Sequence, residues 1–119
     1  MTVESTKEYV SGWRAREKRR VDEAARLVRE LESRLPAVRE ILGRYGVREA
    51  YVFGSFASGQ PGPGSDLDLA VAGARPATWY AMSAEIERAV GLELDVIDLD
   101  SAPAALRDRI LASGRSILR

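Results

Sequence analysis

Cysteine and histidine are both absent from this chain of 119 residues, and asparagine is missing as well. Without cysteine there can be no disulfide, no thiolate nucleophile and no cysteine-based zinc site. Without histidine, a general base or metal ligand must be a carboxylate, a hydroxyl or a backbone group. The missing residue types therefore favour a hard cation bound through oxygen, if the protein binds a metal.

Long apolar runs and a net charge are also missing. The first twenty residues are polar and charged, and no later stretch approaches a membrane span, so we expect a cytoplasmic protein. Eighteen basic and eighteen acidic side chains cancel, which argues against direct binding to nucleic acid or an anionic membrane. A composition of 45% hydrophobic and 30% charged residues is typical of a soluble globular protein, and this length suits one core.

Residues 5–45 have a helical pattern. Proline disfavours a helix interior and suits a first turn, so Pro36 predicts two helices with a kink or break near residues 33–36. We therefore divide the chain into a helical extension, residues 1–35, and a main domain, residues 36–119. The apolar residues of this helical pattern form one stripe, which is either part of the intramolecular core or a contact surface for a homo-oligomer or a partner protein. Its apolar residues alternate in steps of three and four: Val21, Ala24, Val28, Leu31, Leu35, Val38, Leu42 and Tyr45.

Three β-rich segments follow, at residues 47–53, 66–72 and 93–99. A loop rich in glycine and proline separates the first two, and residues 76–90 and 102–118 return to helical spacing, with Leu106, Ile110 and Leu111 expected inward. The expected class is α+β, with a small mixed sheet of about three strands flanked by helices.

Three carboxylates carry the strongest chemical signal. Residues two apart on a strand share a face, so Asp66 and Asp68 should lie side by side while Leu67 and Leu69 face the core. Asp95 lies on another predicted strand, and neighbouring strands are only about 4.8 Å apart. Clustered carboxylates repel one another unless a divalent cation neutralises them, and Mg²⁺ accepts such oxygen ligands.

An anion site is predicted beside the carboxylates. Gly54 and Ser55 follow the first strand, where a missing side chain exposes backbone N–H groups and a hydroxyl can donate a further hydrogen bond. This arrangement suits a triphosphate. Ser65 either hydrogen-bonds within its loop or contacts phosphate.

Together these segments resemble a known family. Gly54 and Ser55, ten intervening residues, and then Asp66, Leu67 and Asp68 are similar to the GSx₁₀DxD signature of the polymerase-beta-like nucleotidyltransferases, especially their minimal (MNT) branch. The later Leu94–Asp95–Val96–Ile97 resembles that family's third-carboxylate strand. The resemblance covers residues 36–119 and implies the family's fold. It also implies that Asp66 and Asp68 hold two Mg²⁺ ions, that Asp95 is a ligand or helps deprotonate the acceptor, and that Gly54 and Ser55, with Ser65, bind the nucleotide.

For this branch the resemblance implies transfer of AMP from ATP to a tyrosine of a HEPN ribonuclease toxin, which makes the chain an antitoxin. One alternative is an antitoxin that acts by binding alone, because Ser58 stands where many relatives carry a basic residue. Another is a small-molecule enzyme of the aminoglycoside-modifying kind, which usually has a second helical domain.

Other notable residues have more ordinary readings. Asp98 and Asp100 are expected at the surface or as capping residues. The basic run at residues 14–20 is either a solvated helix face or a contact for RNA or an acidic partner. Trp13 and Trp79 are each either core or interface residues.

Overall fold

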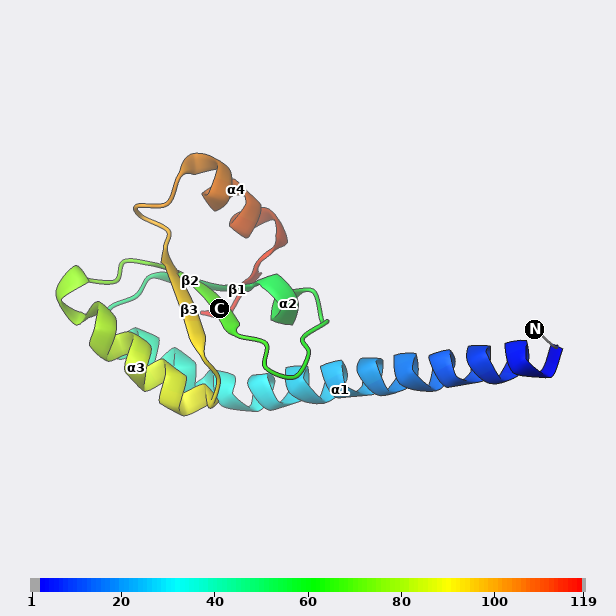
Figure 1. Cartoon of the computed structure of the whole chain (residues 1–119). Coiled ribbons are helices and arrows are strands. Elements are labelled where there is room, and N and C mark those ends of the chain that lie inside the picture. The colour runs from blue at the N-terminus through cyan, green and yellow to red at the C-terminus, as the bar shows by residue number, and fades with distance from the viewer. Residues whose placement is uncertain (1–2, 119) are drawn as a thin grey trace.

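The longest element of the protein is one continuous helix, α1 (Val3–Arg44), in a computed structural model that describes residues 3–118. Figure 1 shows α1 passing beneath a small sheet and extending well beyond it. After α1 the order is β1 (Glu49–Phe53), α2 (Gly54–Ala57), β2 (Leu67–Ala72), the 3-10 helix η1 (Pro76–Thr78), α3 (Trp79–Val90), β3 (Leu94–Asp98), α4 (Ala104–Ser113) and β4 (Arg115–Ser116).

The predicted break near residues 33–36 is wrong, because α1 continues through Pro36 without interruption. Pro36 is exposed, so water can hydrogen-bond the carbonyl that proline leaves without an N–H partner. Its neighbours Leu35 and Val38 are 3% and 0% exposed. Burying such side chains contributes roughly 1.5–3 kcal/mol each, which offsets an interior-proline cost of about 3 kcal/mol. Tertiary packing thus overrides the local signal.

The sheet is mixed and has the strand order β3-β2-β1-β4. The hairpin strands β1 and β2 are antiparallel, whereas β2 and β3 are parallel and joined by a crossover through α3. These three strands confirm the predicted α+β class. The fourth, β4, pairs antiparallel with the free edge of β1 and was not expected.

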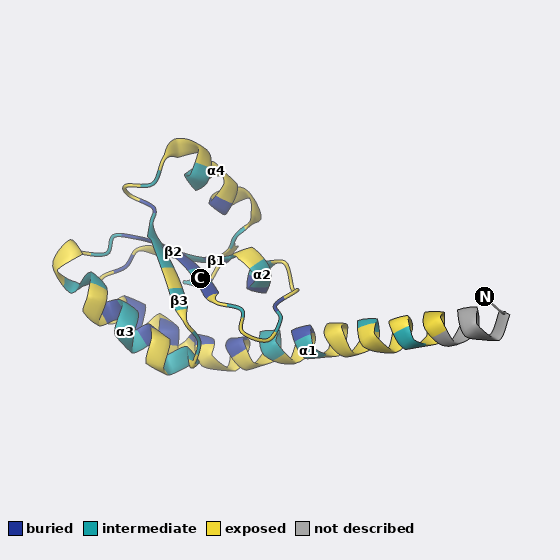
Figure 2. Cartoon of the chain, in the orientation of Figure 1, coloured by how far each residue is buried: buried dark blue, intermediate teal, exposed yellow. Residues whose placement is uncertain are grey.

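Helices cover the two faces of the sheet unequally. On one face Leu67, Leu69 and Val71 pack in the main core with α1 and α3. On the other face Ala70 and Ala72 pack with Ile110 of α4 in a smaller cluster. Figure 2 shows buried residues concentrated along the sheet and the part of α1 beneath it. The second face is therefore only partly covered, and it carries the candidate site.

The C-terminal segment differs from the expectation of a helix to residue 118. Helix α4 ends at Ser113, and Leu111, expected inward, is 45% exposed. The chain then turns so that the Ile117 N–H donates to the Ala50 carbonyl at 3.0 Å, and Ile117 itself is 1% exposed. Pairing with the β1 edge satisfies backbone groups and buries Ile117, which continuing the helix would not do.

Helix α1 is tied to the rest of the domain by side chains on both sides of residue 35. Arg39 donates to the Ile117 carbonyl at 2.6 Å, and Arg115 pairs with Glu32 at 2.6 Å. Leu31 and Leu35 also belong to the main core. Within residues 3–118, no helix is long and apolar enough to cross a membrane.

Candidate functional site

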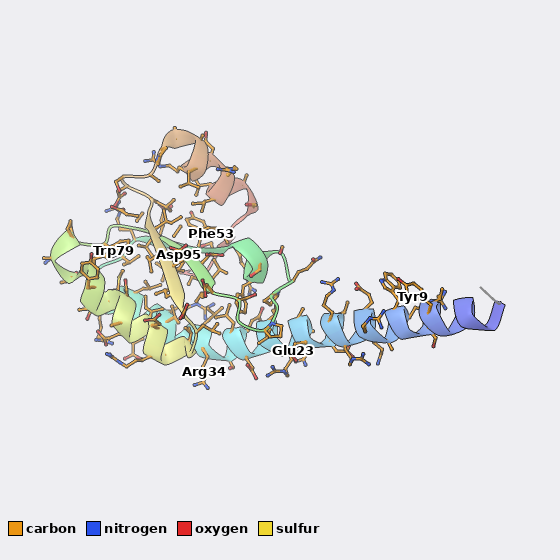
Figure 3. The ribbon with its side chains drawn as sticks, viewed as in Figure 1. Tyr9, Glu23, Arg34, Phe53, Trp79 and Asp95 are labelled. Carbon is orange, nitrogen blue, oxygen red and sulfur yellow. The ribbon has the colours of Figure 1, made fainter. Side chains whose placement is uncertain are left out.

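Two predicted site carboxylates, separated by 26 residues in the sequence, are neighbours across the sheet. Asp68 of β2 is in register with Asp95 of β3, and on its other side Asp68 is in register with Phe53 of β1. The three residues form one row across the sheet, at the ends of the strands nearest α2. Figure 3 labels the two outer members of this row, Phe53 and Asp95. In-register neighbours point to the same face, so the two carboxylates project together.

Strand alternation places this row on the partly covered face. Leu67 and Leu69, which flank Asp68, are 1% and 0% exposed and face the main core as predicted. Asp68 is half-buried on the opposite side, and Asp95 is exposed. Asp66 is exposed and precedes β2 by one residue, so the predicted strand start at residue 66 is one residue early.

Electrostatics shows that the other two carboxylates act on Asp68. The pKa of Asp68 is raised above its ordinary value, first by burial and then by the negative charges of Asp95 and Asp66. Among the side chains of residues 9–118, no basic group forms an ion pair with any of them. The sequence contains no lysine or arginine between Arg48 and Arg75. The site thus has a concentrated negative charge without a protein counter-charge.

Gly54 lies against this charge at the junction of β1 and α2. Its φ is +69°, a conformation that residues with a Cβ rarely adopt. A Cβ at this position would lie 2.2 Å from Asp68 Oδ2. Backbone conformation and close approach therefore both require glycine here, and the absent side chain leaves the Asp68 carboxylate open from this side.

Ser55 and Ser65, the other predicted nucleotide-binding residues, are both half-buried. The Ser55 carbonyl accepts hydrogen bonds from the Gln60 N–H and the Ser58 hydroxyl, which fixes the turn after α2. The Ser65 hydroxyl oxygen accepts from the Gly62 N–H at 2.8 Å, as the loop-bonding interpretation predicted. Its own O–H proton is not used by that bond and remains able to donate.

The oxygen atoms of Asp66, Asp68 and Asp95 are the type of ligand that a hard divalent cation binds. All three are carboxylates, two of them act electrostatically on Asp68, and glycine leaves Asp68 open. Among the described residues, however, no three acidic side chains are already gathered as a metal-binding group. Mutual repulsion opposes tighter packing of three uncompensated carboxylates.

Asp98 and Asp100 have structural roles, as expected. Asp98 accepts hydrogen bonds from the Asp100 N–H at 3.0 Å and the Ser101 hydroxyl at 3.0 Å. Asp100 accepts from the Gly73 N–H at 2.8 Å. Both carboxylates therefore stabilise the turns at the far ends of the strands.

Sequence reasoning overlooked Arg109. A cavity of about 230 Å³ lies between α4 and the end of β1, lined by Phe53, Leu106, Arg109, Ile110 and Ser113. Its wall residue Phe53 is the register neighbour of Asp68. Among the described residues, Arg109 has no ion-pair partner, whereas Arg107 on the same helix donates to the Leu99 carbonyl at 3.0 Å. The only sequence signal was the lack of basic residues between Arg48 and Arg75, which leaves the positive charge at the site to a metal ion or to a more distant side chain.

Comparison with known families finds a match over the part of the chain that carries the site. The profile of the family described as "Polymerase beta, Nucleotidyltransferase" matches residues 37–119, which include every candidate site residue. The "putative protein adenylyltransferase" of Methanocaldococcus jannaschii is 33% identical over 81 residues, covering 66% of this chain and 87% of that protein.

Solved structures show the same fold. A structure described as a "putative minimal nucleotidyltransferase" is 28% identical, with a TM-score of 0.68, and covers 74% of this chain and 93% of its own. A toxin–antitoxin structure with AMP-PNP is 22% identical, with a TM-score of 0.62, covering 70% and 71%. A Shewanella oneidensis complex of a tri-AMPylated HEPN toxin with an MNT antitoxin is 19% identical, with a TM-score of 0.57, covering 73% and 71%.

Proposed function

The chain belongs to the polymerase beta nucleotidyltransferase family, and on that premise we propose that it transfers AMP from ATP to a tyrosine of a HEPN-type toxin and so acts as an antitoxin. The observation that carries the proposal is the row of Asp68 and Asp95 beside Gly54, with Asp66 acting on the same carboxylate. The name of the archaeal relative and the toxin complexes of the structural neighbours support this choice of donor and acceptor.

In this proposal Asp66, Asp68 and Asp95 hold two Mg²⁺ ions. Asp66 and Asp95 are exposed and Asp68 is half-buried, so their side chains can rotate onto a shared ion. When bound, the metal offsets negative charge on the triphosphate and makes the α-phosphorus more electrophilic.

The chain's own groups position the substrates. Gly54 brings backbone N–H groups close to the triphosphate, while the hydroxyls of Ser55 and Ser65 donate hydrogen bonds to it. Arg109 contributes the positive charge that the segment between Arg48 and Arg75 lacks.

The chemical step is in-line substitution at the α-phosphorus. The tyrosine oxygen forms the new P–O bond, the bond to the β-phosphate oxygen breaks, and pyrophosphate leaves. Asp95, exposed at the sheet edge, accepts the phenolic proton.

The direct experiment combines the chain with Mg-ATP and a candidate HEPN-type toxin from the same genome, with mass spectrometry of the toxin as the readout. We expect an AMP adduct on tyrosine that is absent with Asp66→Ala and present with Asp100→Ala, the matched control in the turn at the far end of the sheet. The enzymatic proposal fails if no adduct forms, or if the Asp66→Ala variant produces the same yield.

A second candidate is an antitoxin that neutralises by binding alone. It is favoured by the absence of basic residues from the segment that carries the phosphate-binding glycine. The Asp66→Ala/Asp68→Ala double variant separates the two candidates. If it still suppresses toxin activity at equimolar concentration, binding is sufficient; if suppression is lost while the complex still forms, transfer is required.

A further inference from the structure

Residues 9–21 of α1 project from the body of the protein, and we call this segment the α1 arm (Figures 1 and 2). A helix of 42 residues is about 63 Å long at roughly 1.5 Å per residue, and the longest dimension of the molecule is 64 Å. Ala24, at 5% exposed, is the first buried residue of α1 from residue 9 onward. No other described element packs on the arm.

The α1 arm carries large apolar side chains in water. Tyr9 is 70% exposed, Trp13 55%, Val21 53% and Val10 38%, and Figure 3 shows Tyr9 on the free part of the helix. At about 100° per residue, all four point within roughly 60° of the direction of Ala24, which lies on the body-facing side. The core stripe therefore continues along the arm, on the side toward the globular body.

The arm is also strongly basic. Its residues 9–20 contain five basic side chains and one acidic side chain, Glu17, a net charge of +4, so the rest of this neutral chain carries −4. Glu17 is already paired with Arg20 at 2.6 Å. Arg14, Arg16 and Arg19 form no ion pair with any side chain that the structure describes.

The apolar face of the arm could be covered by the arm of a second copy of the chain, but charge and size together argue against this partner. Pairing two arms would bring two segments of net charge +4 together, which electrostatic repulsion opposes. The arm's apolar face measures about 20 Å by 10 Å, or about 200 Å², whereas a stable interface buries about 800 Å² on each partner. A protein that binds the arm must therefore be acidic there and must also contact the globular part of this chain.

We propose that the α1 arm is a docking surface for the acceptor protein, and that it binds an apolar groove bordered by carboxylates on that protein. The inference rests on the proposed function and identifies where the acceptor is held. In Figure 1 the arm emerges beside α2 and the loop that leads to β2, which carry Gly54, Ser55 and Asp66. Although α1 packs on the opposite face of the sheet, the arm leaves the body at the strand ends that carry Asp68 and Asp95. A protein that contacts both the arm and α2 would thus reach the candidate site.

The experiment uses the 119-residue chain and the HEPN-type toxin that serves as acceptor in the transfer assay, with affinity measured by isothermal titration calorimetry. One variant removes apolar contacts (Tyr9→Ser/Trp13→Ser) and another reverses charge (Arg14→Glu/Arg16→Glu/Arg19→Glu). The matched control, Arg29→Glu/Arg34→Glu, alters exposed arginines on the packed part of α1. Circular dichroism checks that each variant retains its helix.

We expect each arm variant to weaken toxin binding at least about tenfold, as loss of interface hot spots does, while the control stays within about twofold of wild type. Raising the salt concentration should weaken wild-type binding more than that of the charge-reversed variant. The proposal is overturned if both arm variants bind the toxin with wild-type affinity. It is also overturned if analytical ultracentrifugation shows that the wild-type protein is a dimer and the Tyr9→Ser/Trp13→Ser variant is a monomer. Mg-ATP binding, measured separately, tests the nucleotide site alone and should be equal in all variants.

Discussion

Replacement of Gly54 by alanine tests the geometry of the candidate site most directly. Two costs can be worked from the structure. A φ of +69° is a left-handed conformation that costs about 1–2 kcal/mol for a residue with a Cβ. The new Cβ would also lie 2.2 Å from Asp68 Oδ2, so the Asp68 side chain must leave its rotamer, at about 0.5–1.5 kcal/mol.

Together these costs predict destabilisation of about 1.5–3.5 kcal/mol. For a chain of 119 residues this lowers the melting temperature by roughly 6–14 °C, at about 4 °C per kcal/mol. Because Asp68 is displaced, Mg-dependent nucleotide binding should fall as well. The assay is thermal unfolding followed by circular dichroism, together with calorimetric titration of Mg-ATP.

Gly59→Ala is the matched control, because Gly59 has a φ of +76° and an added Cβ there would have no neighbour within 4 Å. It should lose only the conformational part of the stability and keep nucleotide binding. In the double variant Gly54→Ala/Asp68→Ala the clash is gone, so the two single losses should not add. Equal effects of the two alanines on stability and on nucleotide binding would refute the reasoning.

Three further predictions follow from the same structure. The folded-state pKa of Asp68 is raised, so this group's favourable contribution to stability is complete below its ordinary pKa of 3.8 and is lost as pH rises through the folded value. Asp68→Asn should therefore make the protein more stable than wild type at pH 7 in urea unfolding, while removing Mg-dependent nucleotide binding; a less stable variant would contradict this. Arg109→Gln should weaken Mg-ATP binding about tenfold or more, as expected for loss of a charge-assisted hydrogen bond, whereas Arg34→Gln should have no effect, and equal titration curves would exclude the proposed contact. Pro36→Ala should raise the free energy of unfolding by about 1–2 kcal/mol. The alanine restores a helix hydrogen bond, and part of that gain is offset because the unfolded chain without proline has more conformational entropy. An unchanged urea midpoint would show that the proline does not strain the helix.

Much of the candidate site could be predicted because its signals are local. Alternation with a period of two placed Asp68 opposite Leu67 and Leu69, and their burial confirms it. The glycine after the first strand was expected from its position, and its positive φ agrees. The roles of Ser55 and Ser65 in nucleotide binding stay predictions.

Other features depend on contacts that no local pattern contains. The break predicted at Pro36 does not occur, because the neighbouring leucine and valine are held in the core. Helix α4 stops early because the free edge of β1 accepts β4. Arg109 is far from the aspartates in the sequence, and only the packing of α4 brings it to a cavity that is also lined by Phe53, the register neighbour of Asp68.

By itself, the sequence determined which residue types could take part in the chemistry, the class of the fold and the face of the strand on which the aspartate lies. These follow from composition and from the periods of helix and strand, which are properties of short segments. Only the tertiary structure decided that Asp95 pairs with Asp68, that a fourth strand closes the sheet edge and that the α1 arm stands free. The physical reason is that register, edge pairing and burial depend on the free energy of contacts between distant segments, and folding must bring those segments together before that energy is gained.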